Sequence, residues 1–184
     1  FLFTKNEIDF DFINKRIQNA YNYRKQILPN ENCMRIVFGE SDFLPGVVID
    51  KYGDYFSIQI LSAGMELLID EITKSLRLLF PNTKGIIQKN NNKYRELEGL
   101  SQTDVILFGE IPDEITVDEP GIKLSISLLD GQKTGYFLDQ KINRLKIRKF
   151  SKDKTVLDCF CNQGGFALNS AIGGAKNVVG LDIS

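Results

Sequence analysis

Apolar side chains recur at helical spacing over residues 8–28, and Pro29 ends this pattern. From residue 34 the spacing changes to alternation and short apolar runs, which is typical of strands. A single helix is predicted over residues 64–80, between the third and the fourth of these runs. The predicted strands are residues 35–38, 46–51, 55–61, 84–89, 105–108, 115–117 and 122–128.

The pattern changes again after Pro120, the last proline of the chain. The expected elements are a basic helix over 137–150, a strand over 155–160, a helix over 166–173 and a strand over 177–182. The last three form a β-α-β unit, the opening of a doubly wound sheet, which leaves an open edge and an uncovered face. The predicted fold class is therefore an α+β central domain followed by the start of an α/β Rossmann-like domain.

Composition narrows the range of functions. Hydrophobic residues make up 42% of the 184 residues and charged residues 26%, which favours a folded chain over a disordered one. The net charge of −1 excludes a nucleic-acid binder held by bulk positive charge alone, although a local basic face stays possible. The chain contains no histidine, so it offers no His-based acid–base pair or metal ligand.

The three cysteines, Cys33, Cys159 and Cys161, are too few for a disulfide scaffold and favour a reducing, cytoplasmic location. The C-x-C spacing of the last two lacks a second pair, so no metal site is expected, and both residues are interpreted as packing. No apolar run is long enough to cross a bilayer, and the first residues do not have the pattern of a signal peptide, so no membrane partner is expected.

A glycine loop lies between the predicted strand 155–160 and the helix that follows it. Gly164 and Gly165 allow a tight turn and a close approach of the backbone to a ligand. Asp182 ends the next strand, where a carboxylate can accept hydrogen bonds from a ribose diol. The loop lacks the G-x-G-x-x-G spacing of dinucleotide sites, and Asp158 would repel a pyrophosphate. This combination favours S-adenosylmethionine, which carries positive charge, over NAD as the ligand. The alternative is that the glycine-rich turn has only a packing role and binds no ligand.

The chain also resembles the bacterial large-subunit rRNA cytosine-5 methyltransferase family. The residues that carry the resemblance are 40–54 (ESDFLPGVVIDKYGD), 98–100 (EGL), 131–140 (GQKTGYFLDQ) with Asn143 and Arg144, 158–165 and 182–184. Members have an N-terminal PUA domain, a central α+β domain and a C-terminal methyltransferase domain. The resemblance implies that residues 1–30 are a helix and linker after a missing PUA domain, that 31–130 form the central domain, and that 131–184 begin a truncated methyltransferase domain.

The resemblance implies S-adenosyl-L-methionine as cofactor, with the 131–140 block over its amino-acid end and Arg144 on its carboxylate. The alternative for Asp139 is a helix cap. The predicted cofactor-binding residues are Gln132, Thr134, Phe137, Asp139, Gln140, Arg144, Asp158, Phe160, Asn162, Gly164, Gly165, Asp182 and Ser184.

Two basic segments are candidates for contact with RNA. Residues 141–154 hold seven Lys and Arg side chains against Asp153 alone, and the residues predicted to bind RNA are Lys146, Arg148, Lys149 and Lys152. The first helix carries Lys15, Arg16, Arg24 and Lys25 with no acid between Asn14 and Asn30. For both segments the alternative is a solvated face.

The predicted function is S-adenosylmethionine-dependent methylation of RNA, at cytosine C5 of large-subunit rRNA. The chain itself is expected to be inactive, because it contains neither a D-P-P or N-P-P loop nor the catalytic cysteine that the family would supply. The alternatives are a methyltransferase acting on guanine or on a small molecule, and a non-catalytic RNA-binding module. The sequence leaves open whether the chain forms a homodimer.

Overall fold

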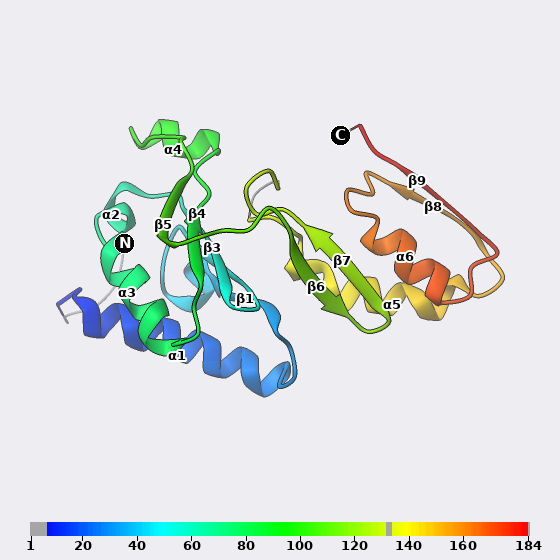
Figure 1. Cartoon of the computed structure of the whole chain (residues 1–184), viewed down its shortest axis with the longest axis horizontal. Helices are drawn as coiled ribbons and strands as arrows, with labels where there is room; N and C mark the ends of the chain where they lie inside the picture. The colour runs from blue at the N-terminus through cyan, green and yellow to red at the C-terminus, as the bar shows by residue number, and fades with distance from the viewer. Residues whose placement is uncertain (1–6, 132–133, 184) are drawn as a thin grey trace. The chain divides into compact units, whose positions relative to one another are not determined.

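The computed structural model describes residues 7–131 and 134–183 (Figure 1). The chain divides into two compact units. The first comprises Phe1–Ile115 and Ser127–Tyr136, and the second comprises Thr116–Ile126 and Phe137–Ser184. Each unit therefore consists of two separate stretches of the sequence. The first helix contributes Ile13 and Ile17 to the core of the first unit. The domain bounds 1–30, 31–130 and 131–184 stay a prediction.

The first unit is built on a five-stranded sheet of order β1-β2-β3-β4-β5. All neighbouring strands are antiparallel except β3 and β4, which are parallel. The strands are β1 (Cys33–Phe38), β2 (Val47–Tyr52), β3 (Tyr55–Ile60), β4 (Gly85–Gln88) and β5 (Val105–Gly109). They confirm the predicted strands of this region to within about two residues, and Gly53, at a φ of 61°, turns the β2–β3 hairpin.

Two helices bury their apolar sides in the core of this sheet. They are α1 (Phe10–Ile27), which Asp9 caps by accepting a hydrogen bond from the Phe12 amide at 2.9 Å, and α3 (Ile69–Leu79). Ile13 and Ile17 of α1 and Ile72 of α3 are fully buried in one hydrophobic cluster with residues of the strands. The helical spacing of these residues is thus explained by burial on one face.

The expectation of one continuous helix over 64–80 is wrong. The structure has a short helix α2 (Ala63–Glu66) before α3, and Leu67 and Leu68 separate the two. The break follows Glu66, whose carboxylate accepts hydrogen bonds from Gln88 at 2.8 Å and from Arg95. These contacts hold the end of α2 at the sheet.

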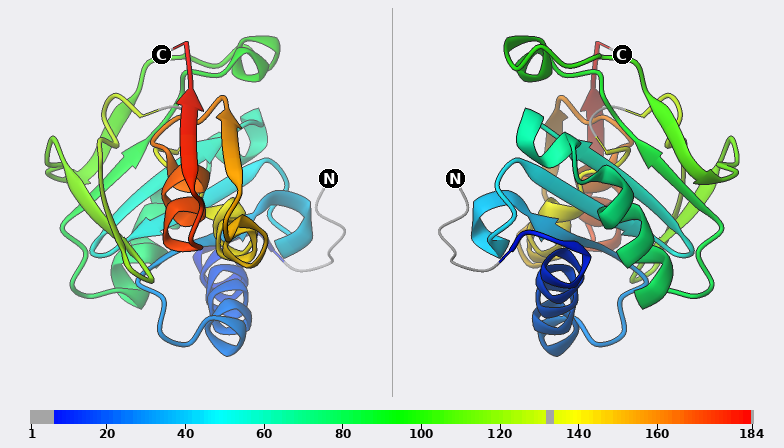
Figure 2. Two further views of the ribbon diagram at one scale, coloured as in Figure 1. Left: turned by 90° about the vertical axis from the view of Figure 1, so that its right-hand side faces the viewer. Right: turned by 90° about the vertical axis from the view of Figure 1, so that its left-hand side faces the viewer.

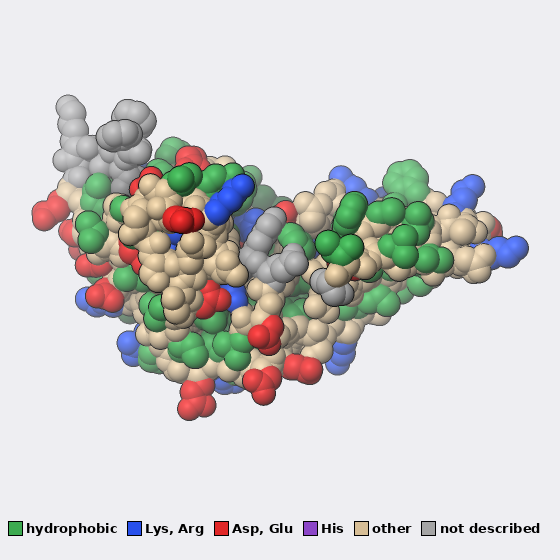
Figure 3. Space-filling view, turned by 90° about the horizontal axis from the view of Figure 1, so that it is seen from above, with side chains coloured by type: hydrophobic (Ala, Val, Ile, Leu, Met, Phe, Trp, Pro, Cys, Tyr) green, Lys and Arg blue, Asp and Glu red, His purple; other side chains and the backbone are tan. Residues whose placement is uncertain are grey.

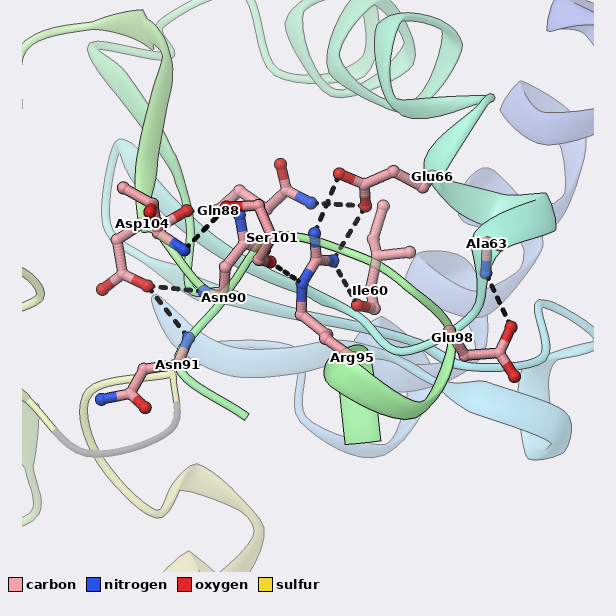
Figure 4. Close-up of polar contacts among 11 residues, drawn as sticks. Ile60, Ala63, Glu66, Gln88, Asn90, Asn91, Arg95, Glu98, Ser101 and Asp104 are labelled. Atoms are coloured by element: carbon pink, nitrogen blue, oxygen red, sulfur yellow. Dashed lines mark hydrogen bonds and ion pairs between the residues drawn. The ribbon is translucent and has the colours of Figure 1, made fainter. Parts of the chain in front are cut away.

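A polar cluster attaches the segment between β4 and β5 to the sheet (Figure 4). The guanidinium of Arg95, only 1% exposed, donates to the carbonyl oxygens of Ile60 at 2.6 Å and Ser101 at 2.7 Å and to Glu66 at 2.9 Å. Arg95 lies in α4 (Lys93–Leu97), a short helix that the sequence pattern did not predict; the side chain of Asn92 caps it. With these acceptors the buried arginine fixes the connection between β4 and β5 to the sheet.

Buried hydrogen bonds attach Thr134 and Tyr136 to strand β2 of the first unit. The hydroxyl of Tyr52 accepts from the Tyr136 amide and donates to the Tyr136 carbonyl, both at 2.9 Å. Thr134 donates to Asp50 at 2.5 Å, and Asp50 forms a two-pronged ion pair with Arg35 at 2.9 Å. Thr134, predicted to bind the cofactor, therefore has a structural partner on β2.

The second unit contains a hairpin and a β-α-β unit. The hairpin pairs β6 (Ile115–Glu119) with β7 (Ile122–Ile126), and a 3-10 turn η2 (Leu138–Gln140) leads into α5 (Lys141–Ser151). The predicted β-α-β order is present as β8 (Thr155–Cys159), α6 (Gly165–Ile172) and β9 (Asn177–Leu181), with β8 and β9 parallel and side by side (Figure 2).

Hydrophobic side chains are exposed on the β8–β9 sheet. Leu157 of β8 is 58% exposed, and Val179 and Leu181 of β9 are 50% and 56% exposed. Figure 3 shows hydrophobic side chains gathered on the surface of this part of the chain. The described helices include none with the length and hydrophobicity of a membrane span.

Candidate functional site

Left-handed backbone shapes the loop between β8 and α6. Phe160, Asn162 and Gly164 have φ angles of 61°, 47° and 72°, so three residues of one short loop turn in the left-handed region. This conformation is easy for Gly164 but costly for a phenylalanine. A Cβ on Gly164 would meet no atom within 4 Å, so the backbone there is open to approach.

Two carboxylates hold this loop at the carboxyl ends of the two strands. Asp158 of β8 accepts a hydrogen bond from the Ala167 amide at 2.9 Å, which ties the first turn of α6 to the strand. Asp182, just after β9, accepts from the Asn162 amide at 2.6 Å and from the Ile183 amide at 2.8 Å. Ligands of open α/β sheets bind at this edge, beyond the carboxyl ends of the strands.

The loop also contains an unsatisfied buried acceptor. The side-chain oxygen Oδ1 of Asn162 is buried and has no hydrogen-bond partner among the residues that the structure describes. A buried acceptor without a partner is costly, unless a ligand supplies the donor. With Asp158 and Asp182 nearby, the loop is rich in acceptors and negative charge. It suits a positively charged ligand with amino and hydroxyl donors and disfavours a pyrophosphate.

The other predicted cofactor residues divide between the units. Thr134 belongs to the first unit, and Phe137, Asp139, Gln140 and Arg144 belong to the second. Gln140 donates to Asp139 and accepts from Asn143, both at 3.0 Å, which gives Asp139 a local partner at the start of α5. Gln132 and Ser184 lie outside the described residues.

Arg144 has a different partner from the one predicted. Its side chain is 2% exposed, and its Nε donates to the two carboxylate oxygens of Glu119 at 3.1 and 3.2 Å, while Nη2 donates to the same carboxylate. Its Nη1 donates to the carbonyl of Phe137 at 2.8 Å. In this structure the guanidinium is thus engaged by an internal carboxylate, and a contact between Arg144 and the cofactor carboxylate stays a prediction.

Glu119 is the residue that the sequence interpretation missed. It follows Ile115 and Val117 in the inward-facing positions of β6, and its side chain is fully buried. An acid in an inward-facing register requires a buried cation or donors nearby. The alternation of buried and exposed positions in β6, which places Glu119 on the buried side, was the sequence signal that could have identified a buried partner for Arg144.

Arg148, which is half-buried, has two partners within the second unit. It donates to Asn169 at 2.7 Å and to the Pro120 carbonyl at 2.5 Å, and its contact with RNA stays a prediction. The other three residues predicted to bind RNA, Lys146, Lys149 and Lys152, are exposed.

The cysteines occupy three different environments. Cys33 is buried, Cys161 is half-buried beside Gly180, and Cys159 is exposed. The packing role predicted for Cys159 is therefore wrong for the described chain, since β8 pairs with a strand on one side only. Among the described residues no group of three or more acidic or cysteine side chains is placed to hold a metal ion.

Comparison with known proteins identifies the family. Residues 91–184 match the family described as "S-adenosylmethionine-dependent methyltransferase". The chain belongs to this family. It is 40% identical over 186 residues to the Ribosomal RNA large subunit methyltransferase I of Aliivibrio fischeri, covering 99% of this chain and 47% of that protein.

Two solved structures share the fold at 27% identity and a TM-score of 0.84, each aligned over 98% of this chain. One is a Streptococcus mutans protein classed as a SAM-dependent methyltransferase, and 47% of its chain is covered. The other is SMU.776, classed as a methyltransferase and crystallised with SAH, with 46% covered. This methyltransferase chain spans about half the length of the curated relatives it matches.

S-adenosylmethionine, the cofactor of the family, fits the acceptor-rich loop. Its amino group and its ribose hydroxyls are donors, and its sulfonium is a cation. The Asn162 oxygen, which has no partner among the described residues, and the two carboxylates are acceptors of the kind that would hold such a group.

We expect Glu119→Ala to destabilise the second unit by about 3–5 kcal/mol, because it leaves the Arg144 guanidinium buried without its carboxylate. Native-state hydrogen exchange of the α5 amides measures this loss. Asp118→Ala, an exposed acid one residue earlier in β6, is the matched control and should change protection little. Equal protection of α5 in Glu119→Ala and in the wild type would contradict a structural role for the pair.

Proposed function

We propose that the full-length protein transfers a methyl group from S-adenosylmethionine to RNA of the large ribosomal subunit. The observation that carries the proposal is the acceptor-rich loop between β8 and α6, together with Asp182 at the end of β9. Support for the RNA substrate comes from relatives at 38–40% identity that are named large-subunit rRNA methyltransferases. The bound cofactor supplies an electrophilic methyl group on a sulfonium.

Within this proposal the loop residues bind and orient the cofactor. Asp182 accepts hydrogen bonds from the ribose hydroxyls, and Asn162 Oδ1 accepts a hydrogen bond that the described residues leave unmade. Gly164 and Gly165 let the backbone approach the ligand, and the Phe160 ring, 82% exposed, offers an apolar face. Gln132, Thr134, Phe137, Asp139 and Gln140 keep the role that the sequence resemblance implies, at the amino-acid end.

We further propose cytosine C5 as the methylated atom, on the resemblance of the 131–140 block. In such chemistry a cysteine thiolate adds to C6 of the ring, C5 takes the methyl group, and loss of the C5 proton expels the thiolate. Cys159 and Cys161 lie on β8 and in the loop beside it, and we assign neither as this nucleophile. The 184-residue chain alone is then inactive.

A radiolabelled methyl-transfer assay tests the reaction and the target. The full-length protein should label large-subunit rRNA, digestion should yield 5-methylcytidine, and the 184-residue chain should give no turnover. Label on a guanine would contradict the cytosine target and support the alternative methyltransferase. Turnover by the 184-residue chain would contradict its inactivity and make Cys161 a candidate nucleophile. No transfer by the full-length protein, despite RNA binding, would favour the non-catalytic RNA-binding module.

Asp182→Ala should weaken cofactor binding by about tenfold to a hundredfold, because hydrogen bonds from the ribose to a charged acceptor are lost. Titration calorimetry with S-adenosylhomocysteine measures the affinity. Asp182 also holds the Asn162 amide, so Asp182→Asn, which keeps one acceptor oxygen, should give a smaller loss. Asp118→Ala is the control for removing an acid from this unit. Unchanged affinity in Asp182→Ala would remove Asp182 from the site.

Replacing Lys146, Lys149 and Lys152 together by alanine should reduce the salt dependence of RNA binding. Each phosphate contact contributes about 0.7–0.9 to the slope of log K against log salt, so loss of three contacts should lower its magnitude by about 2.1–2.7. Lys123→Ala, an exposed lysine of β7, is the control. A salt titration with an unchanged slope would make these lysines a solvated surface only.

A further inference from the structure

A phenylalanine of the first unit adopts a conformation that packing does not explain. Phe43 ends the 3-10 turn η1 (Gly39–Asp42) with φ 57° and ψ 33°, in the left-handed region. This region is strained for a bulky side chain, and glycine or asparagine usually occupies it. The Phe43 side chain is also 63% exposed, so core burial does not offset the strain. Such strain is concentrated at functional sites.

An arginine lies against this ring. The guanidinium carbon of Arg16, on α1, is 4.9 Å from the centroid of Phe43 and 5.1 Å from the centroid of Phe12. Among the described residues no carboxylate is within ion-pair distance of Arg16. Its positive charge is oriented by two aromatic rings and is available to an anion.

Arg16 and Phe43 line a hollow of about 450 Å³, which falls in the size range of small-ligand sites, roughly 300–1,000 Å³. Tyr23, 61% exposed, and the polar side chains of Asn19 and Ser41 also line it, with Ala20 and the pair Arg24–Asp42. All of these residues belong to the first unit. The hollow thus combines two exposed aromatic rings, a cation and neutral polar groups.

The acid of the hollow is already neutralised. Asp42 forms a two-pronged ion pair with Arg24 at 2.7 and 2.6 Å and accepts from the Phe38 amide at 2.6 Å. With the Asp42 carboxylate paired, Arg16 supplies the positive charge of the hollow. The hollow is therefore suited to a single phosphate beside Arg16, and its aromatic rings are complementary to an unstacked base.

We propose that this hollow binds one nucleotide of single-stranded RNA, with the base stacked on Phe43 and the phosphate on Arg16. The proposal rests on the proposed RNA substrate and adds a site in the first unit, on residues that the cofactor loop does not use. A single strand is required because bases within a duplex are not available for stacking on side chains. The left-handed backbone at Phe43 is then the cost of presenting the ring to solvent.

The variant Phe43→Gly in the full-length protein distinguishes nucleotide binding by Phe43 from a purely structural role of its side chain. Glycine adopts a φ of 57° without strain, so the melting temperature should stay the same or rise. Affinity for single-stranded oligoadenylate should fall by about tenfold, the value of one stacked base. Affinity for the same strand annealed to oligouridylate should not change. In methylation assays the KM for rRNA should rise while affinity for S-adenosylhomocysteine holds.

Two further variants complete the test. Arg16→Gln should lower the slope of log K against log salt for oligoadenylate by about 0.7, one phosphate contact. Tyr94→Ala is the matched control, because Tyr94 is 56% exposed in the same unit and lies outside the hollow. It should bind oligoadenylate like the wild type.

The site is overturned if Phe43→Gly binds oligoadenylate as the wild type does, or if Tyr94→Ala weakens binding equally. It is also overturned if Phe43→Gly loses binding of polyglutamate but not of oligoadenylate, which would indicate an acidic protein partner. Retained rRNA methylation with any of these results leaves the proposed function standing. Failure of the wild-type protein to bind or methylate RNA would overturn the proposed function and this site together.

Discussion

The buried carboxylate of Glu119 connects three elements of the second unit that are far apart in sequence. It accepts from Arg144 of α5, and Asn169 of α6 approaches it at 3.5 Å. Asn169 accepts in turn from Arg148, which reaches back to the Pro120 carbonyl in the turn of the hairpin. A buried charge is tolerated only with such a set of donors, so the hairpin and both helices have to meet in one arrangement. Helix α6 begins at the glycine loop, and its Asn169 belongs to this network. The network therefore also fixes the helix that follows the candidate cofactor loop.

In the first unit, buried hydrogen bonds likewise join residues that are far apart in the sequence. Burial, reinforced by the charge of Asp50, raises the pKa of Tyr52, so its hydroxyl stays protonated and donates to the Tyr136 carbonyl. Asp50 has its own partners in Arg35 and Thr134. Through Tyr52 and Asp50, β2 therefore holds Tyr136 and Thr134, two residues of the predicted cofactor block 131–140, at a defined place in the unit.

Strained backbone occurs where each unit has its candidate site. Phe160 and Asn162 are left-handed in the loop of the second unit, and Phe43 is left-handed beside the hollow of the first. Phe160 and Phe43 are also highly exposed, at 82% and 63%, so neither ring is buried in compensation. In each unit, therefore, the folded state accepts a conformational cost at an exposed aromatic residue of a candidate site, where such strain is typical.

The sequence by itself predicted most of the helices and strands and the position of the glycine loop between β8 and α6, although it missed α4 and the break between α2 and α3. Periodicity predicted α1, the strands of the first sheet and the β-α-β order, because local spacing records which face of an element is buried. Asp158, the two glycines and Asp182 identified the loop, because their roles depend on position relative to strand ends. Only the tertiary structure decided that Glu119 engages Arg144, that Arg148 is held internally and that Phe43 faces a hollow beside Arg16. These contacts join residues that are distant in sequence. Charge pairing depends on which groups the fold brings within a few ångströms of each other, and local spacing along the chain does not encode that proximity.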